Sequence, residues 1–97
     1  MSVLVVVQGT PHPDQAETLQ QYQSIALPLI QKHGGQAVAR GKGVASLAGH
    51  HDWAVGSILR FPDLDSVRAW HDDPEYQKII AMRTKAYSDL EINVFQE

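Results

Sequence analysis

An apolar run near the N-terminus constrains the fold most. Residues Val3-Leu4-Val5-Val6-Val7 are followed by Gly9, Thr10 and Pro11. A short β-branched run that ends in turn residues predicts a strand rather than a helix. Because successive side chains in a strand point to opposite faces of its sheet, this strand is apolar on both faces. Helices on one face would leave the other exposed, so we expect a second copy of the chain to cover it.

The segment after this strand predicts a helix that ends at Gly34-Gly35, in the manner of a glycine C-terminal cap. Asp14 and Glu17 have the spacing of a capping box, which places the helix start directly after Asp14. Pro28 lies inside the helix and removes one backbone donor. We therefore expect a kink or a local register change near Ser24.

The middle of the chain predicts two more strands. Residues 36–40 form the first, which Gly41-Lys42-Gly43 interrupts with a bulge or bend before it resumes over residues 44–47. Residues 53–61 form the second. Its odd positions are mostly large and apolar and are expected to pack under the helices, whereas Ala54, Gly56, Ile58 and Arg60 point to the opposite face.

The C-terminal part predicts a helix in two pieces and a last strand. Asp63 is placed to cap the first piece, and Asp73-Pro74 restarts the helix with a cap and a first-turn proline. Apolar residues at helical spacing extend the second piece to Leu90, and residues 91–96 form the fourth strand. The order βαββαβ predicts an α+β, ferredoxin-like fold over residues 1–97 as one domain, with a four-stranded antiparallel sheet and helices on one face.

Composition limits the partners that the chain can have. With 43% hydrophobic and 20% charged residues the chain is typical globular material. A net charge of -3, with eight scattered Lys and Arg residues, argues against nucleic acid. No run approaches the roughly 18 apolar residues of a membrane span, so we expect a soluble, cytoplasmic protein. The absence of cysteine excludes disulfides and thiolate catalysis.

Arg83 is the most unusual placement, because it lies within an otherwise apolar helical stripe. A guanidinium is costly to bury without a partner. It is either a structural residue paired with an acidic side chain such as Glu75 or Asp89, or an anion-binding group that meets a ligand carboxylate. Arg40, beside the glycines of the second strand, either faces solvent or lines a pocket.

The histidines offer little chemistry. His71 is the best general base available and is only a weak catalytic candidate. His50 and His51 are adjacent, and neighbouring residues of an extended chain point apart, which argues against a metal site. We expect His33 to donate to carbonyls at the end of the first helix. The sequence lacks an activated nucleophile, a phosphate loop and a His-Glu pair, so neither a cofactor nor a metal is expected.

Several segments together make the chain recognisable: Pro28-Leu29-Ile30, His33-Gly34-Gly35, Arg40-Gly41, Phe61-Pro62, Trp70, Asp73-Pro74-Glu75-Tyr76-Gln77 and Met82-Arg83. The chain resembles the bacterial family called domain of unknown function 1330, whose members imply a ferredoxin-like protomer paired as a dimeric α/β barrel. The resemblance also implies ligand-binding roles for Arg40, Arg83 and Tyr76. Arg60 departs from the acidic residue expected before Phe-Pro and so weakens any shared acid-base role.

Two functions remain open at this point. The first is a small-molecule-binding protein or enzyme, in which Arg40 and Arg83 hold an anionic or carbonyl-bearing ligand between the helices and the sheet. The alternative is a non-catalytic dimeric module that binds a protein partner, for which no reactive group is needed. RNA recognition is not expected, since the strands lack the aromatic and basic platform on which bases stack.

Overall fold

The computed structural model describes residues 1–97 and has the element order βαββαβ, with the second helical region divided into three pieces. All strand pairs are antiparallel, and the sheet has the order β2-β3-β1-β4. The ferredoxin-like prediction is therefore confirmed. None of the helices is both long and apolar enough to cross a membrane. The elements are β1 (Val3–Pro11), α1 (Ala16–Lys32), β2 (Gln36–Lys42), β3 (Val55–Phe61), α2 (Leu64–Asp72), α3 (Pro74–Gln77), α4 (Ile80–Ala86) and β4 (Tyr87–Gln96).

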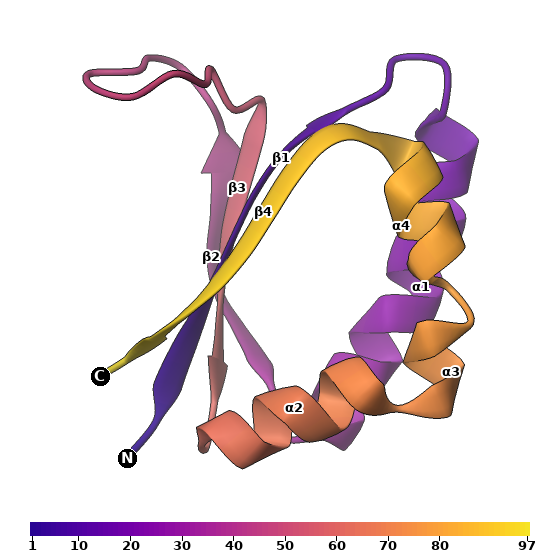
Figure 1. Ribbon diagram of the computed structural model, residues 1–97, viewed down its shortest axis with the longest axis vertical. Coiled ribbons are helices and arrows are strands. Elements are labelled where there is room, and N and C mark those ends of the chain that lie inside the picture. The colour runs from indigo at the N-terminus through magenta and orange to yellow at the C-terminus, as the bar shows by residue number, and fades with distance from the viewer.

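The core lies between the sheet and the helices, which all occupy one side of the sheet (Figure 1). Val5 of β1 is opposite Leu59 of β3 in the ladder, and Val3 is opposite Phe61. The predicted inward face of β3 is thus confirmed, since Leu59 and Phe61 are both buried. The helices contribute the remaining buried side chains: Ala26, Leu29, Ile30, Val67, Trp70, Tyr76 and Ile79.

No helix covers the opposite face of the sheet (Figure 1). Val6 is opposite Ile58, and Leu4 is opposite Phe95, so these four residues share one face. We call them the outer face. Phe95 is 56% exposed. As predicted from its sequence, β1 is therefore apolar on both sides, and only one of these sides is covered within the protomer.

The second strand does not resume after the glycines, so that prediction was wrong. The last backbone contact between β2 and β3 joins the Gly43 amide to the Ala54 carbonyl at 2.9 Å, and the chain then leaves the sheet. Val44 and Leu47 are 95% and 99% exposed in the resulting loop. The bulge lies earlier in β2, where the register shifts around Val38, rather than at the glycines.

The last strand begins four residues earlier than predicted. Tyr87 and Leu90 fit the helical spacing, but the helix ends at Ala86 and both residues lie in β4. The reason is the length of β1, which pairs with β4 as far as Pro11. Gly9 makes this close pairing feasible, because a Cβ there would lie 2.9 Å from ring carbons of Tyr87.

The predicted helix caps were correct at two of three positions. The Asp63 carboxylate accepts from the Ser66 amide at 2.7 Å, and the Asp73 carboxylate accepts from the Glu75 amide at 2.9 Å. The capping box at Asp14 does not form, because Gln15 holds the N-cap position of α1. Its side chain accepts from the Thr18 hydroxyl rather than from a helix amide. The helix α1 continues from Ala16 to Lys32 with Pro28 inside it.

Candidate functional site

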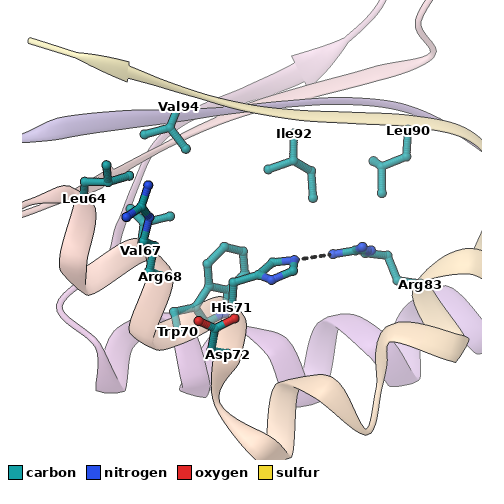
Figure 2. Close-up of a pocket in the computed structure, with 10 residues that line it drawn as sticks. All are labelled: Leu64, Val67, Arg68, Trp70, His71, Asp72, Arg83, Leu90, Ile92 and Val94. Atoms are coloured by element: carbon teal, nitrogen blue, oxygen red, sulfur yellow. Dashed lines mark hydrogen bonds between the residues drawn. The ribbon is translucent and has the colours of Figure 1, made fainter.

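A pocket of about 530 Å³ lies between α2, α4 and β4 (Figure 2). Its sheet wall consists of Leu90, Ile92 and Val94, alternate residues of β4 that point toward the helices. Leu64 and Val67 of α2 extend this apolar lining. The polar lining comes from the opposite side, where the helices contribute Arg68, Asp72, His71 and Arg83.

Arg83 reaches the pocket from α4 and is held by neutral partners. Its Nη1 donates to the Tyr76 hydroxyl at 3.0 Å and lies 3.4 Å from His71 Nε2. Its guanidinium carbon is 5.8 Å from the centre of the Tyr76 ring, within range of a cation–π interaction. Neither Glu75 nor Asp89, the acidic partners considered from the sequence, forms an ion pair with it. Within the protomer, the charge of Arg83 therefore has no counter-charge.

The contact with Arg83 determines the proton position on His71. A guanidinium can only donate hydrogen bonds, so a hydrogen bond at this 3.4 Å contact requires the His71 tautomer with an accepting Nε2 and its proton on Nδ1. Figure 2 shows this pair across the pocket from Leu90 and Ile92. The weak catalytic candidate is thus within the pocket, but its accepting nitrogen is already directed at Arg83.

Tyr76 supports Arg83 from behind the pocket. Its side chain is fully buried, and its hydroxyl is 2.7 Å from the hydroxyl of Tyr22 on α1. Burial, followed by the proximity of Tyr76, raises the pKa of Tyr22 far above its ordinary value, so this phenol stays protonated. Tyr22 and Tyr76 therefore form a neutral, hydrogen-bonded pair that fixes one nitrogen of Arg83.

Trp70 forms part of the pocket wall and is only 3% exposed. Its ring packs against those of Tyr76 and Phe61, with centroid distances of 4.7 Å and 5.6 Å. The indole nitrogen has no hydrogen-bond partner. An unpaired buried donor lowers the stability of a folded protein by roughly 1–3 kcal/mol. The buried position of the Trp70 indole therefore carries a cost in stability.

Arg40 lies elsewhere. It is an exposed residue of β2, opposite Ser57 of β3. β2 and β4 are the two edge strands of the sheet, so the width of the sheet separates Arg40 from the wall that β4 forms. The structure thus brings together Arg83, Tyr76 and His71 but leaves Arg40 outside their pocket.

Two further histidines have carboxylate partners. His33 Nε2 donates to Asp73 Oδ2 at 2.9 Å, so the prediction that it serves the carbonyls of its own helix was wrong. This contact, with the Glu75 amide and Lys32, lowers the pKa of Asp73 from 3.8 to about 2. His51 pairs with Asp89 at 3.1 Å. No group of three or more histidine, aspartate or glutamate side chains is arranged to hold a metal ion.

Sequence reasoning missed Arg68. It lies on α2 one turn after Leu64 and three residues before His71, spacing that puts all three on one helix face. Figure 2 shows its side chain near Leu64 and Val94. The helical spacing was the available signal, but a mostly polar stripe gives no hint that it faces a pocket.

Solved structures with this fold come from several bacteria. A protein of unknown function from Rhodopseudomonas palustris superposes with a TM-score of 0.82 at 21% identity, covering 99% of this chain and 82% of that one. A dimeric ferredoxin-like protein from Thermobifida fusca has a TM-score of 0.67 at 20% identity, with 100% and 92% covered. Another, from Jannaschia sp. CCS1, has a TM-score of 0.78 at 13% identity and full coverage of both chains.

These structures establish the fold and carry no named activity. No curated protein matches the chain. The family model described as domain of unknown function (DUF1330) matches residues 3–95, which is nearly the whole sequence. This chain belongs to that family.

Proposed function

We propose that this chain binds a small organic acid in the pocket between α2, α4 and β4, with Arg83 as the group that holds the carboxylate. The observation that carries this proposal is the uncompensated charge of Arg83 beside an apolar wall. A partly buried cation is stable only when an anion or a set of acceptors meets it. Tyr76 and His71 supply neutral acceptors, and a ligand carboxylate supplies the missing negative charge.

The contacts of Arg83 leave the nitrogens that a carboxylate prefers. A guanidinium has five N–H groups, two of them on each terminal nitrogen. Tyr76 and His71 both engage Nη1, whereas no partner occupies Nε or Nη2. The Nε and Nη2 hydrogens form a parallel fork that matches the two oxygens of a carboxylate. Arg83 is thus anchored on one side and available on the other.

The pocket lining supports a ligand with an apolar body. Leu90, Ile92 and Val94 offer no hydrogen bonds, and the volume of about 530 Å³ lies within the usual range for small-molecule sites. A polyhydroxylated ligand would lose hydrogen bonds to water on this wall without replacement. Carboxylic or keto acids with an aliphatic or aromatic body fit better. His71 and Asp72 are the side chains of the lining that could act as a base on the bound acid.

We propose in addition that two copies pair through the outer face to give a dimeric α/β barrel. Leu4, Val6, Ile58 and Phe95 form an apolar surface that a second sheet would cover. Solved neighbours of this fold are described as dimeric. This arrangement leaves the pocket free, because the pocket lies on the helix side of the sheet. A cytoplasmic location remains our expectation from the sequence.

A non-catalytic module that binds a protein partner is the second candidate. Val44 and Leu47 favour it, since both are almost fully exposed in the loop between β2 and β3. Large apolar side chains that are exposed together often mark an interaction site. This candidate requires no ligand in the pocket, which separates it from the first.

Thermal unfolding with a panel of carboxylic acids tests the proposal. A ligand that binds only the folded state stabilises it by about 2.7 kcal/mol at a hundredfold excess over its Kd. We expect aliphatic or aromatic acids to raise the Tm of the wild type, and Arg83→Met to abolish this response. Arg40→Met removes an arginine outside the pocket and should respond like the wild type.

The variants also separate a binding role from a structural one. An Arg83→Met protein that is as stable as the wild type but unresponsive supports the site. A variant that is strongly destabilised in the absence of acid indicates that Arg83 is an internal structural residue. If no acid shifts the wild-type Tm at millimolar concentration, the proposal fails and the partner-binding module is preferred.

A further inference from the structure

We infer that the acid bound in this pocket is an elongated molecule with a second anionic group, and that Arg68 receives that second group. This inference rests on the proposed function and adds the chemical class of the ligand. It is carried by the two arginines, which lie toward opposite ends of the apolar wall (Figure 2).

The sheet wall sets the length of the pocket. Leu90, Ile92 and Val94 are alternate residues of one strand, opposite Gly9, Val7 and Val5 of β1. At about 3.3 Å per residue, the four steps from Leu90 to Val94 span roughly 13 Å. The facing part of α2, from Leu64 to His71, rises roughly 10 Å at 1.5 Å per residue. The pocket is therefore a trough about as long as an extended aliphatic chain with a polar group at each end.

The charges lie toward the ends of this trough. Figure 2 shows Arg83 close to Leu90 and Arg68 close to Val94, with His71 between them. Arg68, like Arg83, forms no ion pair in the protomer. Asp72 is the only acidic residue of the lining, and it forms no ion pair with either arginine. Both ends of the trough are thus cationic, and no third arginine or lysine lines the pocket between them.

The two arginines are expected to bind an anion with different strengths. Arg83 is partly buried and anchored by Tyr76, whereas Arg68 is exposed. Hydrogen bonds to charged groups contribute more in partly buried positions than ion pairs do at the surface. We therefore assign the primary carboxylate to Arg83 and the selective, weaker contact to Arg68. The ligand class is a dicarboxylate, or a related diacid, with an unbranched apolar middle.

Calorimetric titration with two series of probes tests the assignment. The probes are straight-chain saturated monocarboxylates and α,ω-dicarboxylates of increasing length. For the wild type we expect an optimum chain length in the diacid series, where the diacid binds roughly two- to five-fold tighter than the monoacid of equal length. Added salt should reduce this preference, because the Arg68 contact is exposed.

Three variants make the result specific. Arg68→Met should remove the diacid preference and leave monoacid binding unchanged. Arg83→Met should weaken both series by about tenfold or more. Arg40→Met, which removes a distant exposed arginine, should reproduce the wild-type values.

Failure of this inference is distinguishable from failure of the proposed function. Monoacids that bind as tightly as diacids at every length would overturn the inference while the acid site stands. A diacid preference that survives Arg68→Met would also overturn it. If neither series binds the wild type, the acid-binding function itself is overturned.

Discussion

The Asp73 carboxylate ties two distant parts of the chain together: Oδ2 lies 2.9 Å from His33 Nε2, while Oδ1 accepts from the Glu75 amide. His33 follows α1, and Asp73 is the residue between α2 and α3. The Asp73 side chain thus caps α3 and also binds the residue at the C-terminal end of α1. Lys32 adds a third contact at 3.2 Å.

This arrangement predicts an acid-sensitive stability. The pKa of Asp73 falls from 3.8 to about 2, mainly through His33. Because the folded protein holds this carboxylate ionised, the stabilisation is present above about pH 4 and is lost as the pH falls toward 2. We expect Asp73→Asn to be less stable than the wild type at neutral pH and to lose less stability between pH 4 and 2. Tm measured against pH checks this.

Asparagine is the informative replacement because it still caps a helix, so the comparison isolates the charge. Glu97 provides the reference. Its pKa is also lowered to about 2, chiefly by Arg60, far from Asp73. Glu97→Gln should therefore also reduce the loss of stability between pH 4 and 2, independently of Asp73. Identical acid profiles for Asp73→Asn and the wild type would contradict the role given to Asp73.

The phenol pair predicts different outcomes for two conservative variants. Tyr76→Phe removes the hydroxyl that accepts from Arg83 and that meets Tyr22, and should cost about 1–3 kcal/mol of stability and weaken acid binding. Tyr22→Phe removes only the phenol contact and leaves the Arg83 bond in place. It should lower stability but keep the acid response. Urea denaturation and calorimetry measure the two effects, and equal loss of binding in both variants would argue against the anchoring role.

The outer face predicts the state of association. Light scattering of the wild type at micromolar concentration should give about twice the chain mass of 10.7 kDa. Ile58→Lys places a charge within the outer face and should yield the monomer. Leu27→Lys, at a 49% exposed position of α1, should remain dimeric. A wild type that scatters as a monomer would rule out the paired arrangement.

Metal removal should leave the protein unchanged. His51 is engaged by Asp89, and His33 by Asp73, so neither is available for a shared metal. A chelator is therefore expected to leave the Tm where it was. A drop of several degrees would reveal a bound ion, since a metal that binds the folded state stabilises it.

Sequence patterns predicted the fold because its main signals are local. The apolar run of β1, the caps at Asp63 and Asp73, and the alternation that buries Leu59 and Phe61 each depend on neighbouring residues. The start of β4 could not be placed this way. Tyr87 satisfies a helical spacing equally well, and only pairing with the far end of β1 decides against the helix.

The candidate site was predicted only in part, because only some of its residues have a local signal in the sequence. Arg83 stood out because it interrupts an apolar stripe, but the sequence left open whether an acidic residue pairs with it, and only the structure shows that none does. Arg68 does not interrupt an apolar stripe, so nothing in the sequence set it apart. Its pocket forms only where β4 lies opposite α2 in the folded chain. The His33 contact with Asp73 joins residues 40 positions apart, a distance that no local pattern spans.

The position of Trp70 gives the pocket a built-in optical signal. The chain has two tryptophans, and Trp53 lies away from the pocket, stacked on His51. A Trp53→Phe protein would therefore emit from the pocket wall alone. Because Trp70 is almost fully buried beside Tyr76, its emission should be blue-shifted, and any acid that enters the pocket should change its intensity. Ligands can then be screened by intrinsic fluorescence, without a label and before any reaction has been identified.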